Sequence, residues 1–191
     1  MSTEYSVQNL REATSRVLED LDLDQVYMVN CHIDTRAHLS NRELKSAYTV
    51  RTKIDRNESG DVFAWAKYVV FALGDDGTGD LPDDAGDLTE ALIEETFAWR
   101  VETEWIAKYS GPPDAVSAHS TEDLSAFALL MAPPTLHPYV RDLVQSLTGR
   151  SQHAAFTLGL LTPISAMPDD EVVDIFSENE LDDSGEPTPG G

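Results

Sequence analysis

His32, Asp34 and His38 are the residues whose types and spacing come nearest to a metal site. In a strand they would share one face, and imidazole and carboxylate groups both bind zinc. Alternate residues of a strand stand about 6.6 Å apart, and the sequence offers no fourth ligand beside them. A solvated sheet face is the simpler interpretation, and a metal-dependent hydrolase that uses these three residues is the alternative.

Two further segments have residue types that occur in functional sites. The segment DDGTGD at 75–80 resembles the start of a calcium-binding loop, but it lacks the glutamate that such loops need at the twelfth position. His119 lies near Ser117 and Ser120 without the G-x-S-x-G turn that exposes a nucleophilic serine. Glycine-rich phosphate-binding motifs are absent from the sequence. The sequence therefore predicts a protein without catalytic residues, bound metal or cofactor.

The chain is strongly acidic, because 35 Asp and Glu residues against 13 Lys and Arg residues give a net charge of −22. Such a field disfavours nucleic acid, since contacts with phosphates need clustered cations. It favours basic or unfolded partners, although a high-salt habitat would explain the same composition. Cys31 is the one cysteine, no apolar run approaches 18 residues, and the N-terminus lacks a signal-peptide core. We therefore expect a cytoplasmic protein without internal disulfides or membrane insertion.

The first half of the chain changes from a helical period to a strand period. Apolar residues recur at helical spacing over 6–21, and Ser6 can cap that helix. Four segments with a period of two predict strands over 25–39, 44–54, 62–73 and 97–109. The third is apolar on both faces apart from Lys67, which is typical of a central strand. The acidic segment between the last two, 74–95, predicts a solvated loop.

Prolines divide the second half into two predicted helices. A short helix over 120–131, capped by Thr121, is expected to stop at Pro133 and Pro134. A longer helix then carries one apolar stripe, made of Leu136, Tyr139, Val140, Leu143, Val144 and Leu147. Pro138 would lie in its first turn, and Gly149 could end it in the left-handed conformation.

The C-terminal segment has two predicted parts. Residues 154–161 are apolar and predict an extended segment that packs on the core. Residues 168–191 are acidic, contain no Lys or Arg, and end in GEPTPGG, so we expect a disordered tail with one helical turn at 172–176.

The segment from Pro138 onward resembles the C-terminal third of SecB-family chaperones. There a helix opens with Pro-Tyr-x-Arg-[Asp/Glu], continues as x-x-x-Leu-x-x-Arg and precedes an extended apolar segment. The matching residues in this sequence are Pro138, Tyr139, Arg141, Asp142, Leu147, Arg150, Phe156, Leu158 and Leu160. Ala154 and Ala155 stand where family members often have proline. The order of four strands, two helices and an extended segment over residues 25–165 is similar to SecB as well.

The resemblance implies an α+β fold, in which a four-stranded antiparallel sheet packs helices on one face, and dimers that pair into tetramers. Residues 1–24 would form an N-terminal amphipathic helix, 25–167 the SecB-like core domain, and 168–191 the disordered acidic tail. The structural residues of the motif would be Pro138, Tyr139, Arg141 and Arg150.

The resemblance also implies an ATP-independent holdase, rather than an enzyme, that binds unfolded or extended apolar polypeptides. The clients would be preproteins, with the SecA motor as a possible partner, or an antitoxin of a toxin–antitoxin module. An interaction subunit without general clients is a further alternative. The side chains that we expect to contact clients are Tyr48, Phe127, Leu130, Met131, Phe156, Leu158 and Leu160.

The second predicted strand bears on the choice between these partners. It carries Lys45, Arg51 and Lys53 on one side. SecB proteins that serve export are understood to meet a basic patch of the motor through an acidic sheet face, which like charges would oppose. We therefore expect weak binding to a typical SecA motor, with a dissociation constant above about 10 μM.

Overall fold

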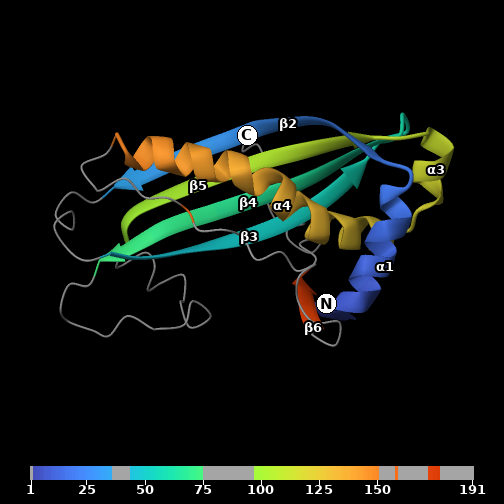
Figure 1. Cartoon of the computed structure of the whole chain (residues 1–191), viewed down its shortest axis with the longest axis horizontal. Helices are drawn as coiled ribbons and strands as arrows, with labels where there is room; N and C mark the ends of the chain where they lie inside the picture. The colour runs from blue at the N-terminus through green and yellow to red at the C-terminus, as the bar shows by residue number, and fades with distance from the viewer. Residues whose placement is uncertain (1, 36–43, 75–96, 151–157, 159–171, 177–191) are drawn as a thin grey trace, which may run out of the picture.

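A computed structural model of the chain describes residues 2–35, 44–74, 97–150, 158 and 172–176. One long helix, α4 (Thr121–Thr148), crosses a four-stranded sheet on one face (Figure 1). The sheet strands are β2 (Asp22–Thr35), β3 (Leu44–Arg56), β4 (Asp61–Gly74) and β5 (Phe97–Ser110). The remaining elements are β1 (Ser2–Ser6), α1 (Val7–Leu18), α3 (Pro113–Ala118) and β6 (Val172–Phe176). The predicted α+β class with helices on one face of an antiparallel sheet is confirmed.

The sheet has the strand order β2-β5-β4-β3, and all three pairings are antiparallel. β3 and β4 form a hairpin whose turn is held by Asn57, because its side-chain oxygen accepts hydrogen bonds from the backbone N–H of Ser59 and of Asp61, both at 3.0 Å. The central position predicted for β4 is confirmed. β2 and β3 are the two edge strands.

The core lies between the sheet and α4, which packs on β3, β4 and β5. Alternate residues of β4 from Val62 to Ala72 point into this core and are fully or almost fully buried. Trp99 and Tyr68 are its largest buried side chains on the sheet, and Phe127 and Leu136 enter it from α4. The other face of β4 also carries buried apolar residues, since Phe71 forms a small cluster with Leu73 and Phe97.

The two helices expected in the second half are one continuous helix of 28 residues, so the predicted break at Pro133 and Pro134 is wrong. Proline removes a backbone N–H and crowds the preceding turn, which costs about 3 kcal/mol in a helix interior. Burial of eleven α4 residues offsets this cost, because one fully buried aliphatic or aromatic side chain contributes about 1.5–3 kcal/mol. Pro138 therefore lies inside the helix rather than in its first turn.

Both predicted ends of this helical region also need correction. The N-cap is Ser120 and not Thr121, because the Ser120 hydroxyl accepts a hydrogen bond from the backbone N–H of Asp123 at 3.0 Å. Gly149 has a φ of −64° and is right-handed, so it does not form the expected left-handed cap. Its N–H instead donates to the carbonyl of Gln145 at 3.0 Å, which continues the helical pattern by one residue.

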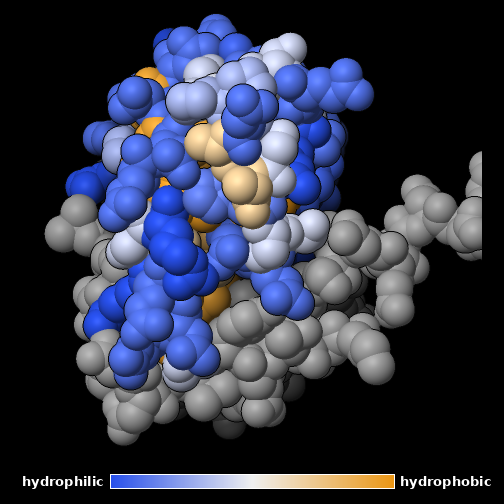
Figure 2. Space-filling model, turned by 90° about the vertical axis from the view of Figure 1, so that its right-hand side faces the viewer, coloured by the Kyte–Doolittle hydropathy of each residue, from blue (hydrophilic) through white to orange (hydrophobic). Residues whose placement is uncertain are grey.

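The N-terminal helix is confirmed as α1, with Ser6 as its cap. Leu10 and Ala13 pack against Ala126 and Leu130 of α4, and Arg16 forms an ion pair with Asp123. Leu18, expected on the apolar face, is exposed. Figure 2 shows that the end of the molecule where α1 and α3 lie is covered mostly by hydrophilic side chains.

The helical turn expected at 172–176 is wrong, because this segment is the strand β6 and pairs antiparallel with β1. Val172, Val173, Ile175 and Phe176 are β-branched or aromatic, and such residues favour strands. The pairing joins segments from the two ends of the sequence (Figure 1). The division into an N-terminal helix, a core over 25–167 and a tail over 168–191 stays a prediction.

Candidate functional site

The edge strand β2 carries most of the exposed large apolar side chains in the described part of the chain. Leu23, Met28, Val29 and Ile33 are 36–50% exposed, and Tyr139 on α4 is 47% exposed. We call these five residues the β2 surface. Single exposed apolar residues are normal, but several along a sheet edge with which no described strand pairs mark a surface that another chain covers.

The β2 surface extends onto the helix-facing side of the sheet through Trp105. Met28 lies directly opposite Trp105 on β5, and opposed residues of an antiparallel pair share a face. The ring of Trp105 lies 5.8 Å from that of Tyr139, centroid to centroid, at an interplanar angle of 37°. A continuous apolar strip therefore runs from the edge strand to the helix.

A β-bulge explains why sequence analysis assigned the faces of β2 incompletely. The pairing with β5 shifts between Met28 and Asn30, so Met28 and Cys31 face the helix side although three positions separate them. A regular period of two over the predicted strand 25–39 would put Val29 on the same face as Cys31 and Ile33. A bulge breaks the period of two, and only the paired strand reveals where it lies.

The second edge strand, β3, forms a different surface with α4. Tyr48, Val50 and Ile54 are half-buried against the core, and so is Met131 of α4. We call these four residues the β3 margin. The ring of Tyr48 lies 5.8 Å from that of His137 and 6.5 Å from that of Tyr68. The margin therefore presents aromatic and thioether groups that are only partly covered.

The residues expected to contact clients fall into three groups. Tyr48 and Met131 are both half-buried against the core and belong to the β3 margin. Phe127, Leu130 and Leu158 are buried, with exposed fractions of 0%, 4% and 1%, so a client does not reach them unless the helix moves. Phe156 and Leu160 lie outside the described residues. The role of all seven residues in client binding stays a prediction.

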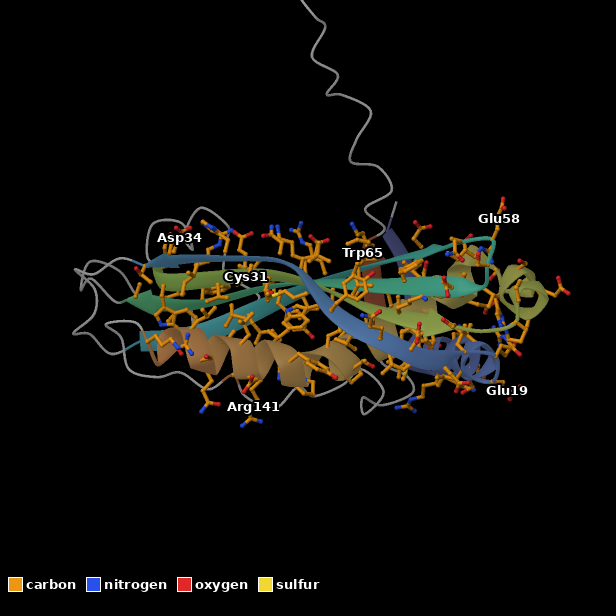
Figure 3. The ribbon with its side chains drawn as sticks, turned by 90° about the horizontal axis from the view of Figure 1, so that it is seen from above. Glu19, Cys31, Asp34, Glu58, Trp65 and Arg141 are labelled. Atoms are coloured by element: carbon orange, nitrogen blue, oxygen red, sulfur yellow. The ribbon has the colours of Figure 1, made fainter. Side chains whose placement is uncertain are left out.

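The SecB-like motif residues lie at the C-terminal half of α4 and just beyond it. Tyr139 contacts Trp105, and Arg141 extends from the side of α4 that faces away from the sheet (Figure 3). Arg150 is exposed after the end of the helix, where its N–H donates to the carbonyl of Leu147 at 3.2 Å. Of the four residues assigned to the motif, Tyr139 has the clearest contact with the sheet.

Two of the three residues of the alternative metal site lie within the described ranges. His32 Nε2 lies 3.0 Å from Asp34 Oδ2 on the exposed sheet face, and His38 lies outside the described residues. No group of three potential ligands occurs among the residues that the structure describes. His119, the other histidine considered above, bonds to Asp20 at 2.9 Å next to the end of α3. The calcium-like segment at 75–80 also falls outside the described ranges.

Burial raises the pKa of one thiol and three tyrosine hydroxyls near the core. Burial raises the pKa of the Cys31 thiol, which disfavours the reactive thiolate. Burial likewise raises the pKa of Tyr48, Tyr68 and Tyr109. All four groups pack on the core, and the hydroxyls of Tyr68 and Tyr109 also make hydrogen bonds with α4.

Comparisons with known proteins support the fold. No protein-family model and no curated protein matches the sequence. A SecB-like chaperone of Mycobacterium tuberculosis, solved in complex with a ChAD peptide from an antitoxin, aligns with a TM-score of 0.59 at 14% identity, over 79% of this chain and 97% of that one. A protein of unknown function from Streptococcus agalactiae aligns over 74% of this chain at 14% identity, and its TM-score of 0.29 is too low to support an argument.

Within the described ranges, no helix is long and apolar enough to cross a membrane. The four-stranded antiparallel sheet with helices on one face matches the SecB-like structure from Mycobacterium tuberculosis. The chain has a SecB-like fold.

Proposed function

We propose that this protein is an ATP-independent holdase that binds extended apolar polypeptide segments at the β3 margin. The observation that carries the proposal is the half-buried row of Tyr48, Val50 and Ile54 along an edge strand of a SecB-like fold, with Met131 of α4 half-buried on the same core. An extended client can pair with the free edge of β3 while its apolar side chains contact the margin. Thioether and aromatic groups adapt to many sequences, which suits a broad client range.

The expected strength of such binding is modest. Covering a further 200–300 Å² of apolar surface would contribute roughly 5–8 kcal/mol, and association itself costs several kcal/mol of that. One segment at one margin would therefore bind weakly. A protein that presents several margins to one long unfolded chain would bind it more tightly, because the second contact is intramolecular.

Self-association through the β2 surface would give one assembly several β3 margins. We propose that a second copy of this chain covers it, with the two β2 edges pairing antiparallel about a twofold axis. Four exposed apolar residues on an unpaired edge are a permanent liability in water, so a permanent partner fits them better than a transient client. Dimers that pair into tetramers would then carry several client surfaces, while the net charge of −22 keeps the loaded complex dispersed.

Two client classes fit the proposal, namely preproteins for export and an antitoxin. The Mycobacterium tuberculosis protein was solved with an antitoxin peptide, which supports the second class for this chain. Weak binding to the SecA motor is expected for the same reason as before, since cations of β3 lie on the outer sheet face. Titration of labelled motor protein at low ionic strength tests this choice, and tight, salt-sensitive binding would favour export.

The experiment for the client surface compares variants that keep the strand. Val50→Thr and Ile54→Thr retain β-branching but add a hydroxyl, so they weaken apolar contacts with little effect on strand propensity. Leu18→Thr makes a related change at an exposed residue of α1, outside both surfaces. We expect the β3 variants to lose suppression of client aggregation while Leu18→Thr retains it. Equal activity of all three would contradict the assignment of clients to the β3 margin.

A further inference from the structure

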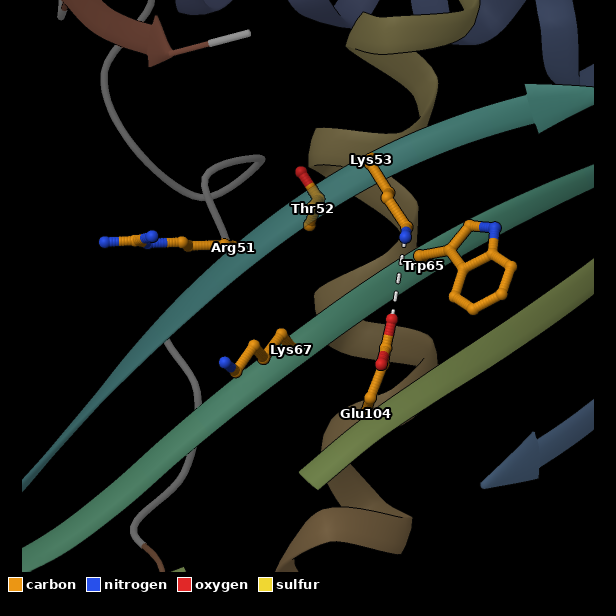
Figure 4. Close-up of a pocket in the computed structure, with 6 residues that line it drawn as sticks. All are labelled: Arg51, Thr52, Lys53, Trp65, Lys67 and Glu104. Atoms are coloured by element: carbon orange, nitrogen blue, oxygen red, sulfur yellow. Dashed lines mark ion pairs between the residues drawn. The ribbon is translucent and has the colours of Figure 1, made fainter. Parts of the chain in front are cut away.

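Cationic side chains gather in a shallow hollow on the sheet face opposite α4. The hollow has a volume of about 190 Å³, and Figure 4 shows the residues that line it, with α4 behind the sheet: Arg51, Thr52, Lys53, Trp65, Lys67 and Glu104. Three cations and one carboxylate give this lining a formal charge of +2 in a chain whose net charge is −22. The lining of the hollow is therefore positively charged, whereas the chain as a whole is negatively charged.

The strand register brings like charges together at the hollow. Arg51 on β3 lies directly opposite Lys67 on β4, and like charges at opposed positions of a sheet are destabilising. A sequence that breaks a local stability rule without a gain in packing commonly does so at a functional site. Glu102 lies 3.3 Å from Lys67 and offsets part of this repulsion, and a further anion bound near Arg51 and Lys67 would offset more of it.

The cations can change partners at low cost. Lys53 Nζ lies 3.6 Å from Glu104 and Lys67 Nζ lies 3.3 Å from Glu102, and both lysine side chains are more than half exposed. Exposed ion pairs of this kind are worth about 0–1 kcal/mol, so an incoming carboxylate competes with them readily. Lys53 also lies 4.2 Å from the centre of the Trp65 ring, which holds the ammonium group at the hollow.

The size and the chemistry of the hollow select the ligand class. Pockets for nucleotides and other small molecules enclose about 300–1,000 Å³, whereas this hollow is smaller and open. A long nucleic acid would extend past the hollow into the repulsive field of the rest of the chain, whereas a few carboxylates would stay beside the three cations. A few carboxylates beside one apolar side chain match a lining of three cations and one indole ring, in which Lys53 lies over the ring and Arg51 and Lys67 extend away from it (Figure 4). We infer that this hollow binds an acidic polypeptide segment of a partner protein, with carboxylates on Arg51, Lys53 and Lys67 and an apolar side chain on Trp65.

This inference does not rest on the holdase activity, because the hollow and the β3 margin lie on opposite faces of the sheet. The hollow would select polypeptides by their negative charge, whereas the β3 margin is proposed to select them by their apolar side chains. An experiment can contradict either proposal without contradicting the other.

The test uses the full chain and fluorescence anisotropy at low ionic strength. The probe is a labelled octapeptide of Asp and Glu with one central Phe, and its matched control replaces every acidic residue by Asn or Gln. We expect the acidic probe to bind, the control to bind at least tenfold more weakly, and 0.3 M salt to reduce the binding of the acidic probe about tenfold. Equal binding of the two peptides would overturn the inference.

Two charge variants locate the site. Lys53→Glu and Arg150→Glu change the net charge equally at exposed residues, but only Lys53 lines the hollow. Lys53→Glu should weaken peptide binding at least tenfold, Trp65→Ala about fivefold, and Arg150→Glu less than twofold, while all three retain aggregation suppression. Equal losses in Lys53→Glu and Arg150→Glu would show a general charge effect and overturn the inference. Displacement of the peptide by equimolar inorganic phosphate would also overturn it, because the hollow would then bind simple anions.

Discussion

The hydroxyl of Tyr68 on β4 donates a hydrogen bond to the carbonyl oxygen of Pro133 in α4, at 3.0 Å. The contact lies where Pro133 and Pro134 remove two helical N–H donors, so the sheet binds the helix at its weakest point. Tyr109 makes a parallel contact with the hydroxyl of Thr135 at 3.1 Å. Tyrosines of the sheet thus help to explain why a proline-rich segment stays helical.

Tyr68→Phe should lower the free energy of unfolding by about 1 kcal/mol, because it removes one buried hydrogen bond and leaves the ring in place. For a chain of this size the melting temperature should fall by about 2–4 °C. Tyr139→Phe is the matched control, since that tyrosine is half exposed. Thermal unfolding followed by circular dichroism compares them, and equal melting temperatures for both variants would show that the bond to Pro133 does not support the helix.

The contact between α1 and α4 should make the free energy of unfolding depend on pH. The Arg16 guanidinium, with help from Ser120, holds the pKa of Asp123 below its ordinary value of 3.8. A carboxyl group whose pKa is lowered by folding stabilises the protein above its unfolded pKa and loses that effect as the pH falls through the folded pKa. Asp123→Asn should therefore destabilise the protein at pH 7 and have a smaller effect near pH 2. Urea unfolding at both pH values measures this, with Asp114→Asn on α3 as the control.

Gly60 in the β3–β4 turn should tolerate no side chain. Its φ is +84°, and a Cβ atom there would lie 2.3 Å from the carbonyl oxygen of Gly111. Gly60→Ala should lower the free energy of unfolding by about 1–3 kcal/mol through backbone strain and this clash. Ser59→Ala, one residue earlier, is the control. Denaturant unfolding should give a clearly lower free energy of unfolding for Gly60→Ala than for Ser59→Ala. Equal free energies of unfolding would contradict the packing of this turn.

The β2 surface predicts self-association. Met28→Asp and Ile33→Asp place a charge on exposed apolar positions and should convert a dimer or tetramer into smaller species without unfolding the chain. Leu18→Asp is the matched control, because Leu18 is similarly exposed on α1. Sedimentation equilibrium at micromolar concentration gives the masses as multiples of 21.0 kDa. A monomeric unmodified chain would contradict both the dimer and the implied SecB-like assembly.

Much of the fold could be predicted because it is encoded locally. Apolar residues on both faces of 62–73 identified a central strand, and Ser6 marked the start of α1. Other features depend on partners that are distant in sequence. The hydrogen bond from Tyr68 and the packing of α4 outweigh Pro133 and Pro134, and neither is visible in a local pattern. The pairing of β6 with β1 joins Val172 to Ser6 and is equally non-local.

The candidate surfaces were predicted only in part for the same reason. Tyr48 and Met131 were expected among the client contacts, and both are half-buried residues of the β3 margin. The exposure of Met28 follows from a bulge and from the edge position of β2, both of which are set by pairing with β5. The hollow depends on the register of three strands, which places Lys53, Trp65 and Glu104 side by side.

The most direct test of the proposed function is aggregation suppression by the purified chain. Several chemically denatured test proteins are diluted into buffer with a molar excess of this protein, and light scattering is followed with and without ATP. Holdase activity should strongly reduce the scattering of each client. ATP should make no difference, because the β3 margin binds clients without a nucleotide-driven step. Unchanged scattering for every client, or suppression only in the presence of ATP, would contradict the proposed function.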